Sequence, residues 1–189
     1  MKIGLIGEAP NDTISIKNIL EKKYKTPEIK FTSLIDRLPL PIKGSFLDNP
    51  KTKNIIRRQY ERKKPNIIIF IRDLDGLLNN KTQLKLRKEY FSDSNKTVDK
   101  KGIYLLNIYE IEALILSDID TFNDIYGTNI EKFDNPMNIE EPKELLKKES
   151  KYHYNESHNP DIFKELDFDK VNNCKYFNEF IKKLDKILV

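Results

Sequence analysis

The stretch IIIFIRDLDG, at residues 67–76, constrains the fold of this chain more than any other segment. Its first five residues form a continuous apolar run, four of them isoleucine, which follows a Pro-Asn pair. A β-branched run of this length is typical of a strand buried on both faces of a sheet. The run then turns abruptly into charged residues, among them Asp73 and Asp75. We therefore expect a central strand that ends in two carboxylates.

The rest of the chain alternates strands with helices around this stretch. Apolar runs predict strands at residues 2–7, 28–36 and 102–106, and amphipathic patterns predict helices at 13–24, 53–64, 77–91 and 108–122. Residues 38–50 hold three prolines and a glycine and predict a long loop, and residues 92–101 predict a polar loop. This order predicts an α/β fold with a mostly parallel central sheet flanked by helices.

The chain changes character after Tyr126 and Gly127. Polar, irregular sequence leads to short predicted helices at residues 143–148 and 161–166 and to a longer one at 173–188. The last carries a stripe of apolar residues with helical spacing, which predicts contact with the core: Phe177, Phe180, Ile181, Leu184, Ile187 and Leu188. We expect an α/β domain at residues 1–126 and a helical C-terminal extension at 127–189 that packs on the same domain.

Composition narrows the class of protein. Among 189 residues, 38% are hydrophobic and 34% are charged, as in soluble globular chains. No stretch approaches the roughly 18 apolar residues that span a membrane, so no membrane partner is expected. Cys174 is the only cysteine, which excludes a disulfide framework and a cysteine-based zinc site. A cytoplasmic location is the default expectation for such a chain.

Basic residues are unevenly spread. Residues 51–101 contain 15 Lys or Arg and 6 Asp or Glu, although the net charge of the whole chain is only +4. Basic surfaces bind polyanions through counterion release, so this segment favours a nucleic-acid or nucleotide partner. A solvated, lysine-rich helical surface is the alternative. The candidate nucleic-acid contacts are Arg57, Arg58, Arg72, Lys81 and Lys85 in this segment, with Lys143 and Lys151 further along.

Acidic residues follow the predicted strands. Glu8 ends the first strand, Asp73 and Asp75 end the central one, and Glu112 follows the strand at 102–106. In a parallel sheet these residues meet at the carboxyl edge, where α/β proteins bind ligands. Oxygen clusters of this kind bind Mg²⁺, and two such ions can promote phosphodiester cleavage. The alternative is an ordinary turn at Asp73 to Gly76, because Asp and Gly often end strands.

Two further carboxylates have open roles. On a helix at 108–122, Glu112 falls within the apolar arc and Glu110 falls on the opposite, solvent side. A carboxylate in a buried stripe is costly unless a metal or a basic group compensates it; otherwise Glu112 lies at the edge or caps the helix. Asp12 is either the cap of the first helix or a cation ligand.

Three segments resemble the TOPRIM domain, a Rossmann-like fold shared by topoisomerases, primases and OLD-type nucleases. IGEAPNDTISIKNIL resembles the segment that carries the family's acidic residue at the first strand-to-helix turn. IFIRDLDG resembles its Asp-x-Asp motif. NIYEIEALILSD resembles a helix of OLD-type nucleases and related small TOPRIM-like proteins, whose Glu-Ala pair follows the fourth strand. The resemblance covers residues 1–120.

The resemblance implies ligation of Mg²⁺ or Mn²⁺ by Glu8, Asp73 and Asp75, with Asp12 as a further candidate ligand and Glu112 as another catalytic carboxylate. It also implies cleavage of nucleic acid, DNA in preference to RNA. Small TOPRIM proteins often stand beside ATPases, which implies a separate ATPase partner in anti-phage defence or DNA maintenance. The chain has no Walker A pattern of its own. Oligomerisation is left open.

The sequence leaves the chemistry undecided at two points. OLD-type nucleases use a basic residue near the metals, and Arg72, Lys143, Lys151 and His153 are equal candidates, each with a surface charge as the alternative. The family usually has Gly after its first Glu, whereas this chain has Ala9-Pro10, which favours a regulatory module that binds metal or nucleic acid without cutting. A phosphatase-like enzyme with Asp73 as nucleophile and Asp75 as acid/base is disfavoured by Glu8.

Overall fold

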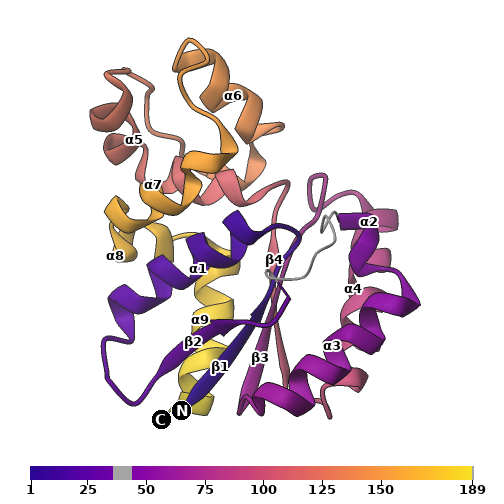
Figure 1. Cartoon of the computed structure of the whole chain (residues 1–189). Helices are drawn as coiled ribbons and strands as arrows, with labels where there is room; N and C mark the ends of the chain where they lie inside the picture. Colours follow the sequence, from indigo (N-terminus) through magenta and orange to yellow (C-terminus); the bar gives the residue numbers. More distant parts are fainter. Residues whose placement is uncertain (36–43, 189) are drawn as a thin grey trace.

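A computed structural model describes residues 1–35 and 44–188 (Figure 1). Part of the loop predicted at 38–50 lies outside the described residues, and a short helix, α2 (Gly44–Leu47), follows. The sheet has four parallel strands in the order β2-β1-β3-β4. They are β1 (Lys2–Ile6), β2 (Lys30–Ser33), β3 (Ile67–Asp73) and β4 (Gly102–Asn107). The predicted α/β class with a parallel central sheet is confirmed.

The strand β3 is buried on both faces, as its apolar run predicts. It lies between β1 and β4, and every residue from Ile67 to Arg72 is buried. Successive side chains alternate between two cores, because strand side chains point to opposite faces. By the same alternation, Arg72 lies on the face of Ile68 and Phe70, and Asp73 on the face of the odd-numbered isoleucines.

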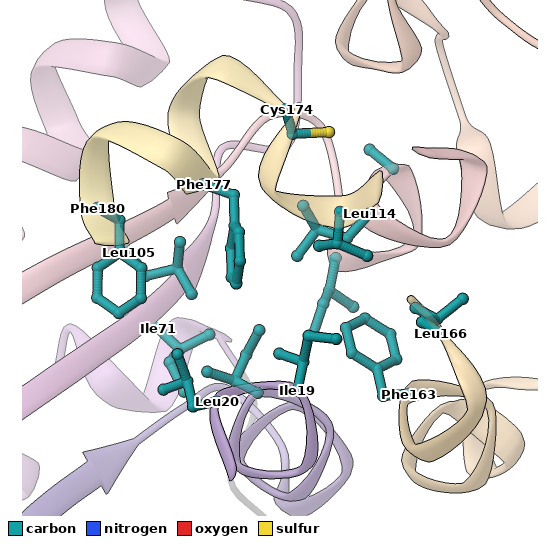
Figure 2. Close-up of a cluster of buried hydrophobic side chains, with 14 of the residues drawn as sticks. Ile19, Leu20, Ile71, Leu105, Leu114, Phe163, Leu166, Cys174, Phe177 and Phe180 are labelled. Carbon is teal, nitrogen blue, oxygen red and sulfur yellow. The ribbon is translucent and has the colours of Figure 1, made fainter. Parts of the chain in front are cut away.

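The first core lies between the sheet and the helices α1 (Pro10–Lys23), α7 (Asn159–Glu165), α8 (Phe168–Asn172) and α9 (Lys175–Leu188). Helix α9 packs on β4, and α7 packs on α1. Side chains of α1, the sheet and α9 point into one cluster (Figure 2). In α9 the predicted apolar stripe is buried at Phe177, Phe180, Ile181 and Leu184, whereas Ile187 is exposed.

The second core lies between the opposite face of the sheet and the two basic helices, α3 (Pro50–Lys63) and α4 (Lys81–Thr97). The helix predicted at 77–91 starts later and runs longer than expected, so the polar loop predicted at 92–101 is wrong over its first six residues. The reason is packing: Tyr90, Ser94 and Val98 are spaced four apart and are all buried on the side of the sheet. Asn95 also accepts a hydrogen bond from the Gly102 amide at 2.7 Å, which fixes the approach to β4.

The segment after β4 departs from the predicted helix at 108–122. Tyr109 takes a left-handed backbone (φ 60°), and the chain then forms a 3₁₀ helix, η1 (Ile111–Asp118), followed by α5 (Ile119–Tyr126). Every residue of η1 except Ser117 is buried. Because η1 buries side chains on all sides, the one-sided stripe assumed for an α-helix does not exist there.

The later elements continue at the same end of the sheet. They are η2 (Pro136–Asn138), α6 (Pro142–Glu149) and η3 (Glu156–His158). Figure 1 shows α5 and α6 beyond the carboxyl ends of the strands. No helix within the described ranges is both long enough and apolar enough to cross a membrane.

Candidate acidic site

Four carboxylates meet at the carboxyl edge of the sheet. Glu8 follows β1, Asp12 lies in the first turn of α1, Asp73 ends β3, and Glu112 lies in η1. Their proximity is visible in their electrostatics: burial, then Asp12, Glu8 and Glu112, raise the pKa of Asp73 well above its ordinary value. The structure therefore brings together four of the five carboxylates that the sequence selects.

Asp73 is the centre of this cluster. Its Oδ1 accepts a hydrogen bond from Asn107 Nδ2 at 2.9 Å, and this contact alone among its main influences lowers its pKa. No Lys or Arg of the described residues pairs with its carboxylate. Asp73 is thus a half-buried carboxyl group that no cation of the described residues neutralises, and its raised pKa reflects the cost of ionising it there.

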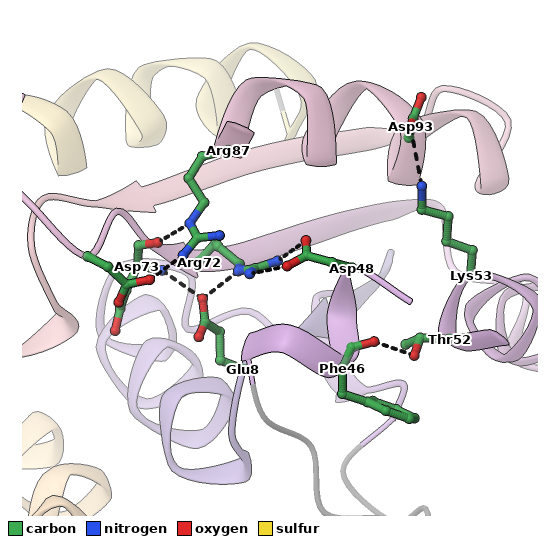
Figure 3. A network of polar contacts seen from close by, with 10 residues as sticks. Glu8, Phe46, Asp48, Thr52, Lys53, Arg72, Asp73, Arg87 and Asp93 are labelled. Carbon is green, nitrogen blue, oxygen red and sulfur yellow. Dashed lines mark hydrogen bonds and ion pairs between the residues drawn. The ribbon is translucent and has the colours of Figure 1, made fainter. Parts of the chain in front are cut away.

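Glu8 is held by the neighbouring strand (Figure 3). Its Oε1 accepts from Arg72 Nε at 2.5 Å and from the Asp73 amide at 3.2 Å. Both contacts use the same oxygen, and the side chain is only 17% exposed. Glu8 is therefore oriented through one oxygen beside the backbone of Asp73.

Asp12 acts as part of a helix cap. Ala9 is the N-cap of α1 and Pro10 occupies the first helical position, where its missing N–H costs nothing. Asp12 Oδ2 accepts from the Ala9 amide at 3.0 Å, as an acidic residue does at this position of a capping box. Burial first, and then the charge of Glu112, raises the pKa of Asp12 to about 8. The cap is observed, and the role as a ligand stays a prediction.

Glu112 is buried, as predicted, with 3% of its surface exposed. Neutral groups of the C-terminal part hold it: Tyr154 Oη lies 3.1 Å and Asn159 Nδ2 2.9 Å from Glu112 Oε1. Burial raises its pKa, and the Asn159 hydrogen bond opposes that rise. Sequence reasoning missed Tyr154 and Asn159, because they lie 42 and 47 residues away along the chain.

The expectation that Glu110 faces solvent is wrong. Its side chain is 18% exposed and lies 3.1 Å from Lys143 Nζ. The expectation assumed an α-helix, whereas Glu110 precedes a 3₁₀ helix as its N-cap residue. Lys143 also pairs with Glu156 at 3.3 Å, and its charge lowers the pKa of Glu112.

Asp75 does not join the cluster in this structure. The strand ends at Asp73, and Asp75 lies in the following turn with a left-handed φ of 56°. The strand alternation that would place both carboxylates on one side does not extend that far. Asp75 instead forms an ion pair with Arg87, and Arg87 Nε donates to the Asp73 carbonyl at 2.8 Å. Arg87 therefore holds the turn of the Asp-Leu-Asp motif in place, although sequence reasoning did not single out this residue.

Arg72 is buried. The prediction that it contacts nucleic acid is therefore wrong for this structure, and so is the alternative that it is a surface charge. Only 1% of the side chain is exposed. It makes a two-pronged ion pair with Asp48, at 2.9 and 3.0 Å, and its guanidinium lies 4.4 Å from the centre of the Tyr90 ring. The signal was present in the sequence, because Arg72 shares the buried face of Phe70.

The other basic candidates are divided between two places. Four of them lie on α3 and α4, over the second core: Arg57, Arg58, Lys81 and Lys85. Arg57 pairs with Glu61 and Asp99, and the other three are exposed. Lys143, Lys151 and His153 lie in or after α6. Lys143 pairs with Glu110 and Glu156, which lie outside the four-carboxylate cluster, and Lys151 and His153 are exposed.

The cluster is not a ready-made ligand shell. Within the described ranges, no three Asp, Glu, His or Cys side chains stand where they would all hold one ion. The hydrogen bonds of Glu8, Asp12 and Asp73 each use a single oxygen, and the second oxygen accepts none from the described residues. An ion at this cluster would have to take one or two of these carboxylates directly and keep water in its other positions, as Mg²⁺ does in proteins.

A separate cavity of about 500 Å³ lies between η1, residues 132–136 and the start of α9. Its lining includes Ser117, Lys170 and Cys174, whose thiol lies 2.5 Å from the Ser117 hydroxyl. None of the four clustered carboxylates lines it. The acidic site is therefore distinct from this cavity.

The fold and the site define an α/β protein with a parallel sheet and a carboxylate cluster at its carboxyl edge. The chain belongs to the family described as domain of unknown function DUF4276, whose model matches residues 10–185. The match includes Asp12, Asp73 and Glu112. Searches of curated proteins and of solved structures find no match.

Proposed function

We propose that this protein is a Mg²⁺- or Mn²⁺-dependent nuclease of TOPRIM type that cleaves phosphodiester bonds in nucleic acid. One observation carries the proposal: Asp73 is half-buried beside Asp12, Glu8 and Glu112, all of which raise its pKa, and no Lys or Arg within the described ranges pairs with it. Like charges held this close favour a divalent cation, which would offset their repulsion and the cost of their burial.

The residues divide into ligands and supports. Asp73 and Glu8 would hold the ion through their second oxygens, with Asp12 and Glu112 contributing through water. A bound ion supplies a nucleophilic water at neutral pH and stabilises the leaving oxygen. Asn107 orients Asp73, and Arg72 orients Glu8, by the contacts already described. Lys143 is the basic residue that we assign to the charge of the scissile phosphate.

The partners follow from the resemblance and from the basic helices. We propose that the substrate is DNA in preference to RNA, bound by surface lysines and arginines of α3 and α4. We propose a separate ATPase partner, in anti-phage defence or DNA maintenance, and a cytoplasmic location.

The second candidate function is a regulatory module that binds metal and nucleic acid without cutting. Asp75 favours it, because this carboxylate of the Asp-Leu-Asp motif is paired with Arg87 instead of facing Asp73. The ion pair between Asp75 and Arg87 also argues against a phosphatase, because Asp75 would have to be free to act as its acid/base.

A cleavage assay separates these functions. The protein is incubated with supercoiled plasmid, single-stranded DNA or RNA, in Mg²⁺, Mn²⁺ or EDTA, with and without a neighbouring ATPase. We expect metal-dependent nicking that Asp73→Asn and Glu8→Gln abolish. Asp93→Asn is the matched control, because Asp93 is an exposed aspartate of α4 that pairs with Lys53 and Lys96. Metal binding without cleavage under every condition would establish the regulatory module instead.

A further inference from the structure

Tyr152 is the most exposed of the large apolar side chains in the described ranges, with 77% of its surface accessible. It lies between α6 and η3, in the segment that stands beyond the carboxyl ends of the strands (Figure 1). A single exposed tyrosine is ordinary by itself. Three features suggest a role for Tyr152: its backbone conformation, its charged neighbours, and its place two residues before Tyr154, which contacts Glu112.

The backbone holds Tyr152 in this position. Lys151 and Tyr152 both have left-handed φ values, 53° and 64°, a conformation that is uncommon for residues other than glycine. The Tyr152 amide donates to the Lys147 carbonyl at 2.7 Å, and the Lys151 amide donates to the Lys148 carbonyl at 3.0 Å. Further on, the Tyr154 amide donates to the buried Ser150 hydroxyl at 3.1 Å. A hydrogen-bonded loop therefore presents the ring to solvent.

Two exposed lysines precede the ring in the sequence, with the exposed Glu149 between them. Lys148 and Lys151 are exposed and have no ion-pair partner among the described residues, whereas Lys147 pairs with Glu144 at 2.8 Å. An exposed aromatic ring beside free lysines is the combination that binds single-stranded nucleic acid, because the ring stacks on a base and the cations contact phosphates.

The loop also leads directly to the acidic site. Tyr154, whose hydroxyl contacts Glu112, follows Tyr152 by two residues. Two residues span at most about 7 Å, so the two tyrosines are anchored close together. The loop that carries Tyr152 therefore also carries a side chain that supports the acidic site.

We propose that Tyr152 is a stacking site for an unpaired base of single-stranded nucleic acid, with Lys148 and Lys151 contacting the adjacent phosphates. The inference rests on the proposed function, since it names the substrate class of the same site. Bases inside a duplex are already stacked on both sides, so an exposed tyrosine ring can stack only on an unpaired base.

Fluorescence tests the stacking directly. The chain contains no tryptophan, so Tyr152→Trp introduces a unique probe at the site. In EDTA, we expect a thymidine oligonucleotide to quench this tryptophan strongly and a blunt duplex of equal length to quench it weakly. Ile187→Trp is the matched control, because Ile187 is 42% exposed on α9, outside the basic helices α3 and α4. Equal quenching of both tryptophans, or equal quenching by duplex and single strand, would overturn the proposal.

Affinity gives a second, independent readout. In EDTA, Tyr152→Ala should weaken binding of a labelled thymidine oligonucleotide roughly 5- to 150-fold, the range expected for one stacked base, and Tyr152→Phe should bind like the wild type. The melting temperature of Tyr152→Ala should be unchanged, because the side chain is exposed. Unchanged affinity in Tyr152→Ala would contradict the stacking role. Because no metal is present, these measurements do not depend on cleavage: stacking without any nuclease activity would overturn the proposed function alone.

Discussion

Asp12 combines two roles at the scale of a single residue, a helix cap and a member of a carboxylate cluster. The cap requires only an oxygen acceptor for the Ala9 amide, which asparagine also supplies. Burial first, and then the charges of the neighbouring carboxylates, oppose the charge of Asp12, so its pKa rises from 3.8 to about 8. Substitution by asparagine therefore removes the charge and keeps the cap.

The first prediction concerns the pH dependence of stability. Between pH 3.8 and about 8, the folded protein binds more protons at Asp12 than the unfolded chain, so stability falls as pH rises. In EDTA, Asp12→Asn should gain stability over the wild type as pH rises through this window, by up to about 1.4 kcal/mol per pH unit. Urea unfolding at several pH values measures this gain. A difference that does not change with pH would contradict the assigned repulsion.

The individual site residues show what a sequence can and cannot specify. Glu8, Asp73 and Glu112 were predictable, because each follows a strand and parallel strands share one carboxyl edge. Tyr154, Asn159 and Asp48 were not, because they reach the site only through packing between distant parts of the chain. Asp75 was selected by its spacing, but the backbone turned left-handed after the strand ended and Arg87 captured its carboxylate.

At the scale of the element, the strand β3 supplies residues to the acidic site and its support from both of its faces. Its alternation sends Asp73 toward the first core and Arg72 toward the second. Arg72 then reaches Glu8 and Asp48, so the buried cation fixes a carboxylate that belongs to the acidic cluster.

The second prediction tests this support. Arg72→Leu should lower the free energy of unfolding by about 2–4 kcal/mol, because it leaves Glu8 without its cation in a largely buried position. Asp48→Asn is the matched control and should cost only about 1 kcal/mol, since Asp48 is 49% exposed. Denaturant unfolding of both variants in EDTA measures the two losses. Equal losses would show that Arg72 serves Asp48 and not Glu8.

Other elements were predictable to differing degrees. The β-branched run fixed the central strand, and the apolar stripe of α9 identified its buried face, because both patterns match the period of the structure they form. The 3₁₀ helix η1 was read as an α-helix, because a segment buried on all sides carries no periodic signal. The length of α4 was underestimated, because Tyr90, Ser94 and Val98 are buried in a segment that otherwise looks polar.

At the scale of the whole molecule, the C-terminal helices and the sheet share one core. Helix α9 covers β4, and the hydrogen bonds to Glu112 come from Tyr154, between α6 and α7, and from Asn159, the first residue of α7. The TOPRIM resemblance covers only residues 1–120, so it does not include this contribution. The acidic site is thus completed by a part of the chain for which the sequence predicted packing and basic candidates, but no support for a carboxylate.

The most direct test of the central claim is calorimetric titration of Mg²⁺ into the wild type, Asp73→Asn and Asp93→Asn. We expect saturable binding to the wild type and to Asp93→Asn, and none to Asp73→Asn. We also expect Mg²⁺ at about 100 times its Kd to raise the unfolding free energy of the two binding proteins by about 2.7 kcal/mol. Equal binding by all three proteins, or no binding by the wild type, would contradict a cation site at Asp73.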